Sequence, residues 1–271
     1  AQQGAEVIMA CRRVAEGEAR ATEIRDEFPA AKVEVRKLDL SNLSSVRIFA
    51  EWVNKSFDRL DGLLNNAGVM NTPQQKTADG FEMQFGVNHL GHFLLTELLV
   101  DLLKASSPSR IVNVSSCFHD KAMGRDGKID FEDLNFESRK YDGWQAYAQS
   151  KLANLLFARH LATLLPDGQT ANAVHPGVIN TNLGRHMAAP MRLALAIGGP
   201  LALKSVGQGA ATQTYVATHP SLNGVTGAYF ADCNTAETSA FGRDIALAAA
   251  LWDKTLQVLG ELGHPVAWPK D

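Results

Sequence analysis

Short runs of apolar and β-branched residues alternate with longer helical patterns along almost the whole chain. The segments between most of these runs repeat their apolar residues with a helical period. Strands that alternate with helices in this way form parallel βαβ units. Several runs are apolar on both faces, as expected for strands that helices cover from either side. The sequence therefore predicts the α/β class, with a doubly wound parallel sheet at the centre.

The predicted elements follow one another without a repeat or a linker, which indicates a single domain over residues 1–271. Two segments break the rhythm and are expected to be loops, residues 117–142 and residues 178–204, the second partly helical. Strands are expected in AEVIMA, KVEVRKL, GLLNNAG, RIVNVSS, TANAVHP and GAYFAD. Helices are expected at about residues 14–28, 43–57, 81–103, 144–165, 205–218 and 237–259.

Composition narrows the class of protein. The chain is 45% hydrophobic and 20% charged, with a net charge of -3, so nothing favours a nucleic-acid partner. Cys11, Cys117 and Cys233 lie far apart and show neither a disulfide framework nor zinc-site spacing, which favours a reducing compartment. No run approaches the roughly 18 apolar residues that span a bilayer. We therefore expect an intracellular protein, free in the cytoplasm or associated with a membrane.

Tyr147 and Lys151 stand four residues apart near the start of a predicted helix, so they share one helical face. Such a pair is most often two solvated polar groups. A nearby ammonium, however, favours tyrosinate over phenol and lowers a pKa that starts near about 10. The spacing alone leaves both interpretations open, a polar surface or a group suited to proton transfer.

Several motifs taken together resemble the short-chain dehydrogenase/reductase family, and more closely its retinol dehydrogenase branch. They are KLDLSNLSSV, LLNNAGVM, TADGFEMQFGVNHLGHFLLT, RIVNVSS, YAQSKLANLLF and VHPGV. The similarity spans essentially the whole chain, and the set is far more specific than any one motif. The resemblance implies a Rossmann-type domain that uses a nicotinamide dinucleotide to interconvert an alcohol and an aldehyde or ketone.

The resemblance also implies four catalytic residues. Tyr147 matches the family's acid/base, and Lys151 matches its partner, which also binds the nicotinamide ribose. Ser116 matches the residue that hydrogen-bonds the substrate oxygen, and Asn88 matches the asparagine that holds a water of the proton relay. A hydride and a proton must both move in this reaction, and Ser116 would stabilise the charge that develops on oxygen. For Ser115 we expect strand packing or a local hydrogen bond.

Other matches concern the cofactor. Asp39 resembles the aspartate that contacts the adenine, although it could instead cap the following helix. Asn66, Ala67 and Gly68 match the turn beside the adenine ribose, where glycine permits close approach, or form a plain β-turn. The segment after the last long strand matches the one that touches the carboxamide, or is an ordinary strand exit. The remaining expected cofactor contacts are Leu40, Pro176, Gly177, Val178 and Thr181.

The end of the first predicted strand bears on the choice of dinucleotide. In the family an acidic residue here bonds the ribose of NAD, whereas an arginine accommodates the 2'-phosphate of NADP. This chain has Cys11 followed by Arg12 and Arg13, and no acid. Arg12 therefore favours NADP (NADPH) over NAD, and Arg13 is better explained as a solvated charge at the start of a helix.

We expect no metal site. His89 and His92 have ligand-like spacing but no third ligand beside them. The stretch GRDGKIDFEDL lacks the regular oxygen ligands of a calcium loop.

The loop over residues 178–204 favours a lipophilic substrate, because it supplies flexible apolar surface that either packs or covers the site. The side chains concerned are Met187, Met191, Leu193, Leu195, Ile197, Leu201 and Leu203. The sequence leaves both a monomer and a homo-oligomer open.

The start of the chain departs from the family. The family begins with a strand and a TGxxxGxG turn whose backbone N–H groups receive the pyrophosphate. Here AQQGAEV matches the end of the first helix and the entry to the second strand. We therefore expect the first strand unit, and any membrane anchor, to be absent. An inactive nucleotide-binding regulatory or scaffold protein is the alternative, which the intact Ser116, Tyr147 and Lys151 oppose.

Overall fold

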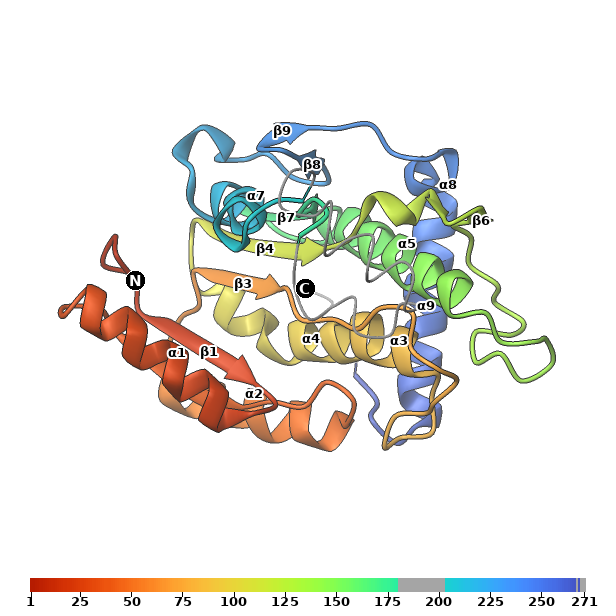
Figure 1. Cartoon of the computed structure of the whole chain (residues 1–271), viewed down its shortest axis with the longest axis horizontal. Coiled ribbons are helices and arrows are strands. Elements are labelled where there is room, and N and C mark those ends of the chain that lie inside the picture. Colours follow the sequence, from red (N-terminus) through yellow and green to blue (C-terminus); the bar gives the residue numbers. More distant parts are fainter. Residues whose placement is uncertain (180–202, 267, 269–271) are drawn as a thin grey trace.

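The computed structural model describes residues 1–179, 203–266 and 268. Each of the six predicted strand runs overlaps a strand (Figure 1). These strands are β1 (Val7–Cys11), β2 (Val33–Lys37), β3 (Gly62–Asn65), β4 (Ser109–Val114), β7 (Gln169–His175) and β8 (Tyr229–Ala231). The long helices are α1 (Val14–Glu27), α2 (Leu43–Ser56), α4 (Gly91–Lys104), α5 (Gly143–Ala162), α7 (Val206–Thr218) and α9 (Ile245–Glu261).

Shorter elements lie between them. The predicted loop over residues 117–142 contains η2 (Cys117–His119) and a two-stranded hairpin of β5 (Lys121–Ala122) and β6 (Arg125–Asp126). The predicted loop over residues 178–204 falls mostly outside the described residues. The other short elements are α3 (Met83–Phe85), η1 (Gly86–Leu90), η4 (Pro220–Leu222), β9 (Asn234–Thr235) and α8 (Ala240–Arg243).

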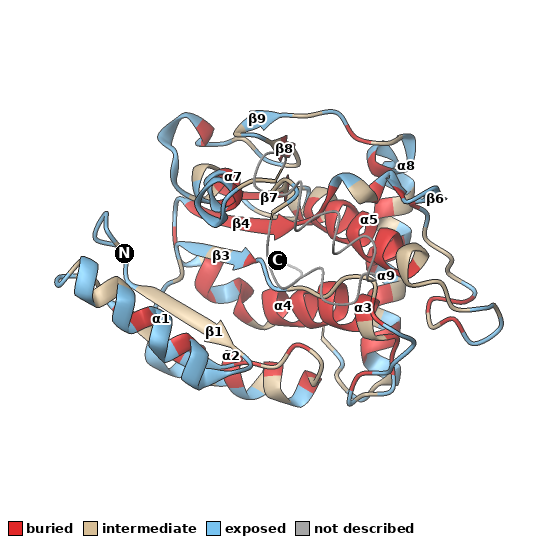
Figure 2. Ribbon diagram, viewed as in Figure 1, coloured by how far each residue is buried: buried red, intermediate tan, exposed pale blue. Residues whose placement is uncertain are grey.

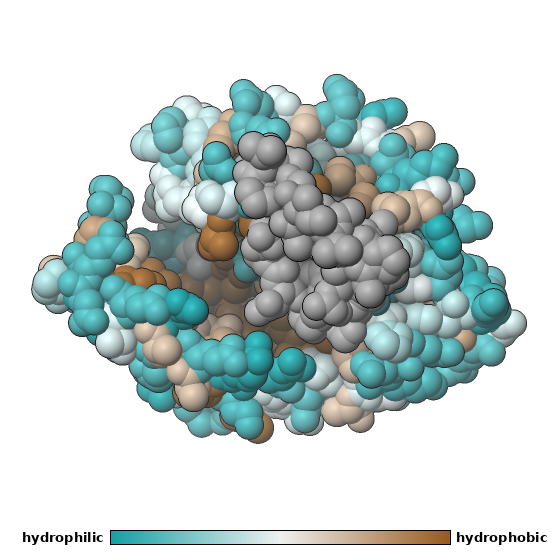
Figure 3. Space-filling model, viewed as in Figure 1, coloured by the Kyte–Doolittle hydropathy of each residue, from teal (hydrophilic) through white to brown (hydrophobic). Residues whose placement is uncertain are grey.

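The long strands are parallel, as predicted, and the described ones form two sheets rather than one. β1 pairs with β2, and a second sheet has the order β3-β4-β7-β8-β9, in which only β9 runs antiparallel. β1 and β3 are therefore each an edge among the described strands. Figure 3 shows apolar atoms in the hollow between the two sheets, and Leu64 of β3 is 45% exposed.

Helices cover both faces of the sheets, which confirms the doubly wound architecture. Along β4, Ile111 packs into the core formed with α4, α5 and α9, whereas Val112 packs on the opposite face with Val216 of α7. On the smaller sheet, Val35 faces α1. Figure 2 shows that α4, α5 and β4 are largely buried, whereas α1 keeps much of its surface in solvent. The core therefore centres on β4 and α5.

Two predicted helices are interrupted. The helix expected at residues 81–103 runs through α3, the π-helical turn η1 and α4. The helix expected at residues 237–259 was wrong as a single element, because Asp244 is extended between α8 and α9. The Asp244 side chain accepts a hydrogen bond of 2.9 Å from the Leu247 N–H, so it caps a new helix instead of continuing the old one.

No helix in the described part of the chain is both long and apolar enough to cross a membrane.

Glu97 of α4 is a buried acid without a hydrogen-bond partner among the described residues. Its side chain is 7% exposed, and neither carboxylate oxygen receives a donor. Burial raises the pKa of Glu97 to about 8, and the positive charge of Lys104 opposes this rise. The folded state therefore holds a proton that the unfolded state releases at a much lower pH.

This difference predicts how stability changes with pH. The folded pKa of Glu97 lies above its unfolded value, so the stability that protonated Glu97 contributes is complete below about pH 4.3 and is lost as pH rises through about 8. The parent should therefore lose free energy of unfolding between pH 5 and pH 8. We expect this loss to be smaller in Glu97→Gln, by at least about 1 kcal/mol, because glutamine carries no proton that the rise in pH can remove. Urea denaturation at both pH values measures this. Asp101→Asn, an exposed acid on the same helix, is the control and should leave the parent's pH dependence unchanged.

Candidate active site

The predicted site residues follow the carboxyl ends of parallel strands. β3, β4 and β7 run in the same direction, so residues 66–68, 115–117 and 176–178 leave the sheet at one edge. Helix α5 packs against β4 and β7. This helix begins at Gly143 because the Asp142 carboxylate accepts hydrogen bonds from the Trp144 and Gln145 N–H groups, at 3.0 and 3.1 Å. The first turns of α5 are thereby fixed beside the strand ends.

Tyr147 and Lys151 are buried rather than solvated. Each side chain is 4% exposed, and the Lys151 Nζ lies 5.7 Å from the centre of the Tyr147 ring. The Lys151 Nζ donates a hydrogen bond of 2.9 Å to the Val114 carbonyl at the end of β4. The face shared by these two residues therefore borders the sheet edge, not the solvent.

Burial dominates the electrostatics of the pair. It raises the pKa of Tyr147, while the neighbouring Ser116 hydroxyl lowers this pKa in part. Burial also lowers the pKa of Lys151 to about 8. The expected lowering of the Tyr147 pKa by the Lys151 ammonium is therefore not the leading effect. Removing tyrosinate from water destabilises it by more than a nearby positive charge stabilises it.

The two serines after β4 do different things. Ser115 donates from its Oγ to the Lys151 carbonyl at 2.6 Å, so it ties the strand to α5 through a bond between distant parts of the chain instead of a local one. Ser116 caps η2, and its Oγ accepts a hydrogen bond of 3.2 Å from the Phe118 N–H. One acceptor position of Ser116 is thus occupied, which leaves its hydroxyl proton free to be donated.

Asn88 lies in the π-helical turn and is fully buried. Its Oδ1 accepts from the Val69 N–H at 2.8 Å, and its Nδ2 donates to the Val69 carbonyl and to the Ser150 Oγ, both at 2.9 Å. A π turn inserts one residue into a helix and often marks a functional position. Here it aims Asn88 at the loop after β3 and at α5.

Gly68 sits between Asn88 and Lys151. A β-carbon at Gly68 would lie 3.0 Å from the Asn88 Oδ1 and 3.6 Å from the Lys151 Nζ. The glycine is therefore needed for close approach, as the sequence suggests, and it places the loop after β3 against the residues of α5.

Two of the predicted cofactor contacts, Asp39 and Leu40, follow β2 of the smaller sheet. Asp39 follows β2, and its Oδ1 accepts from the Ser41 N–H and Oγ at 3.0 and 2.6 Å. The alternative that Asp39 caps α2 is wrong, because the cap is Asn42, whose Oδ1 accepts from the Ser45 N–H at 3.1 Å. Leu40 is buried in the core.

The remaining predicted contacts lie at the ends of β3 and β7. Asn66 accepts a hydrogen bond of 3.4 Å from the Gln213 Nε2, and Ala67 is exposed. Pro176 leaves β7, Gly177 has a φ of 90°, and Val178 is 54% exposed. Thr181 lies outside the described residues, as do all members of the apolar set in residues 178–204 except Leu203.

Arg12 borders a hollow of about 510 Å³ at the end of β1. Arg13 borders it too, but its guanidinium pairs with Glu16 at 2.8 Å, as suits a solvated charge at the helix start. Arg12 makes no ion pair within the part of the chain that the structure describes. Among the arginines that line this hollow, Arg12 is the one that forms no ion pair with a described acidic residue.

Comparison with known proteins agrees with this arrangement. A family model described as enoyl-(acyl carrier protein) reductase matches residues 1–230. Retinol dehydrogenase 14 of Mus musculus is 45% identical over 96% of this chain and 80% of its own length. Retinol dehydrogenase 13 of Homo sapiens is 45% identical over 96% of this chain and 78% of its own length. The chain belongs to the short-chain dehydrogenase/reductase family.

Solved structures place this dehydrogenase/reductase in the same fold. The crystal structure of an uncharacterized protein from Mycobacterium Paratuberculosis is 37% identical, with a TM-score of 0.76 over 100% of this chain and 88% of that one. A short chain dehydrogenase from Pseudomonas syringae is 26% identical, with a TM-score of 0.64 over 83% of each chain. The protein is therefore a nicotinamide-dinucleotide-dependent enzyme that interconverts alcohols and carbonyl compounds.

An aromatic group beside Tyr147 was not anticipated from the sequence. The Phe118 and Trp144 rings lie 6.1 and 6.5 Å from the Tyr147 ring and 5.8 Å from each other. Both are only partly buried. Their proximity to predicted site residues in sequence, two positions after Ser116 and three before Tyr147, is the signal that could have identified them.

His89 and His92 of the dehydrogenase/reductase serve the core. The His89 Nε2 lies 2.9 Å from the Thr255 Oγ1 on α9, and the His92 Nδ1 lies 2.9 Å from the Asn88 carbonyl. Burial lowers their pKa values to about 3 and about 4, so both rings are neutral. Within the described ranges, no three His, Cys, Asp or Glu side chains gather as a metal site would require.

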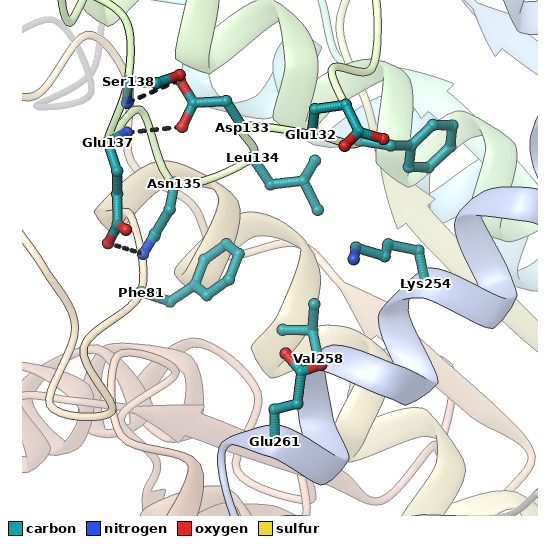
Figure 4. A pocket seen from close by; sticks show the side chains of 11 residues that line it. Phe81, Glu132, Asp133, Leu134, Asn135, Glu137, Ser138, Lys254, Val258 and Glu261 are labelled. Atoms are coloured by element: carbon teal, nitrogen blue, oxygen red, sulfur yellow. Dashed lines mark hydrogen bonds between the residues drawn. The ribbon is translucent and has the colours of Figure 1, made fainter.

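A second hollow, of about 450 Å³, lies apart from the predicted site (Figure 4). Its wall includes Phe81, Leu134 and Val258, with Glu132 and Lys254 at its margin. Asp133 in this wall already accepts from the Glu137 and Ser138 N–H groups. None of the predicted catalytic or cofactor-binding residues lines it.

Proposed function

We propose that the protein is an NADP-dependent oxidoreductase that interconverts a lipophilic alcohol and its aldehyde or ketone, with Tyr147 exchanging the proton. The observation that carries this proposal is the joint burial of Ser116, Tyr147 and Lys151 where β4 ends against α5. Three polar side chains in so dry a place are costly for stability, so their retention there argues for chemistry.

The proposed division of labour follows from the contacts. NADP or NADPH supplies the hydride chemistry when bound. Ser116 donates its hydroxyl proton to the substrate oxygen, because the Phe118 N–H occupies only one lone pair of the hydroxyl and leaves the O–H able to donate. Tyr147 gives or takes the proton at that oxygen. Its raised pKa keeps it protonated, which suits donation to a carbonyl.

Lys151 and Asn88 support the reacting groups. Lys151 holds its Nζ at the Val114 carbonyl, from where it binds the nicotinamide ribose and favours tyrosinate when Tyr147 loses its proton. Both the oxygen and the nitrogen of the Asn88 amide are hydrogen-bonded, to Val69 and Ser150. The Ser150 Oγ in turn donates to the Tyr147 carbonyl at 2.8 Å. The proton relay assigned to Asn88 therefore works together with a structural task, which is to keep Gly68 and α5 in contact.

The cofactor preference rests on Arg12. Of the two guanidinium groups at the end of β1, Arg13 is paired with Glu16, whereas Arg12 is left for a 2'-phosphate. We assign the adenosine end of NADP to Arg12 and Asp39, next to Leu40. Asn66, Ala67 and Gly68 are assigned to the side of the adenine ribose as well. The nicotinamide carboxamide is assigned to Pro176, Gly177, Val178 and Thr181.

The lipophilic substrate is supported by two observations. Phe118 and Trp144 offer partly exposed aromatic surface next to Tyr147. The similar proteins of mouse and human are named retinol dehydrogenases. A bulky apolar alcohol or aldehyde would bury these rings, whereas a small polar ketone would leave them exposed to solvent.

Replacement of Tyr147 by Phe tests the proton-transfer role. Phenylalanine keeps the ring that packs on Phe118 and Trp144 but has no hydroxyl. We therefore expect kcat to fall at least about a hundredfold while NADPH affinity stays the same. Steady-state kinetics and fluorescence titration measure the two quantities. Tyr215→Phe, on the exposed side of α7, is the matched control. Turnover of the Tyr147 variant within a few-fold of the parent would refute the role.

Replacement of Arg12 by Ala tests the choice of dinucleotide. A charge-assisted contact to the 2'-phosphate exists only with NADPH, so we expect this variant to lose at least about tenfold in affinity for NADPH and little for NADH. Arg13→Ala should change both affinities by less than about threefold, because its guanidinium is paired with Glu16 in solvent. Equal losses for both cofactors in Arg12→Ala would show that Arg12 acts through structure.

A substrate panel tests the lipophilic preference. We expect a higher kcat/KM with retinaldehyde and medium-chain aldehydes than with small polar ketones. Trp144→Ala should raise the KM for retinaldehyde by about tenfold and leave small ketones nearly unaffected, since only the bulky substrate covers that ring. A clear preference of the parent for polar ketones would contradict the proposal.

A further inference from the structure

His119 is a buried histidine that is not among the predicted site residues but contacts the backbone of one of them, Ser116. It ends the η2 turn, and its side chain is 3% exposed. Its Nδ1 lies 2.7 Å from the Ser116 carbonyl oxygen. Its Nε2 lies 3.3 Å from the backbone nitrogen of Ser239, a residue 120 positions further along the chain. One ring therefore connects the proposed catalytic serine to the segment before α8.

The two partners determine which nitrogen carries the proton. The Ser239 N–H can only donate, so the Nε2 of His119 must accept. The Ser116 carbonyl can only accept, so the Nδ1 must donate. Both contacts are satisfied by one neutral tautomer. Burial lowers the pKa of His119, which keeps the ring in that neutral form.

Both ends of this bridge are themselves held. Ser239 caps α8, with its Oγ accepting from the Gly242 N–H at 3.1 Å. The His119 ring packs edge-on against Tyr229 of β8, with ring centres 4.9 Å apart. The Ser116 carbonyl also accepts from the His119 N–H at 3.0 Å. The ring therefore has little freedom to move, and neither has the peptide of Ser116.

We propose that His119 is a positioning residue, which holds Ser116 at the substrate oxygen by bridging its carbonyl to the start of α8. The inference rests on the proposed function, because it presumes that the Ser116 hydroxyl acts in the reaction. Without the bridge, the short η2 turn would be the main restraint on the backbone of Ser116, and small displacements of a reacting group are costly.

Three substitutions separate the two contacts. Asparagine places an amide about where Nδ1 lies, so His119→Asn can still donate to the Ser116 carbonyl. Glutamine reaches about as far as Nε2, so the side chain in His119→Gln can accept from the Ser239 N–H but no longer donates to the Ser116 carbonyl. Phenylalanine keeps the packing on Tyr229 and makes neither hydrogen bond.

Kinetics should then rank the variants by whether they hold Ser116. We expect kcat to fall at least about tenfold in His119→Phe and His119→Gln, and less than about threefold in His119→Asn. NADPH affinity should be unchanged in all three. His160→Phe, whose ring stacks on Trp252 away from the site, is the matched control and should behave as the parent does. Equal losses in the Asn and Gln variants, or a Phe variant within twofold of the parent, would overturn the proposal.

Two further measurements distinguish this inference from the proposed function. Ser116→Ala should lower kcat at least as much as His119→Phe; if it has no effect, the role of Ser116 fails and the inference fails with it. If Ser116→Ala is impaired and His119→Phe is not, only the inference fails. Nitrogen-15 NMR of labelled histidine at neutral pH, assigned with His119→Phe, should show a neutral ring protonated on Nδ1. A ring protonated on Nε2 would overturn the bridge regardless of activity.

Discussion

The contact between the end of β4 and the face of α5 is the interaction on which the candidate site depends. The Val114 carbonyl accepts from the Lys151 Nζ at 2.9 Å and from the Asn154 Nδ2 at 3.1 Å. In return, the Ser115 Oγ donates to the Lys151 carbonyl at 2.6 Å. Parallel strands that helices cover on both faces are ordinarily largely apolar. Here polar bonds in a dry interface fix both the sliding and the rotation of α5, and with them the position of Tyr147.

This arrangement has a thermodynamic cost that other contacts offset. Lys151 is removed from water, and the lowering of its pKa to about 8 reflects that loss. The cost is tolerated because α5 is anchored along its whole length. Its first turn is capped by Asp142, and its far half packs through Phe157 against Trp252 of α9, with ring centres 5.9 Å apart. A helix held at both ends can keep an unfavourable charge near its middle.

Sequence periodicity was sufficient for the fold, and the motifs pointed to residues that the fold brings to the carboxyl ends of β3, β4 and β7. All six predicted strands and the long helices are present, because alternating apolar patterns report directly on burial. The break at Asp244 was missed, since Ser, Asp and Asn within a helical pattern become caps only when the tertiary structure turns the chain there. The π turn at Asn88 has no periodic signature either, because it adds a single residue to an otherwise regular helix.

The electrostatics of the site were least accessible from the sequence. The i, i+4 spacing of Tyr147 and Lys151 suggests that one charge shifts the other, but the depth of burial, which decides the sign for Tyr147, depends on β4 and the η2 turn. His119 and Phe118 were not identified as functional candidates from the sequence. Phe118 could have been found by its proximity to Ser116, whereas the importance of His119 depends on the Ser239 backbone, which only the fold brings beside it.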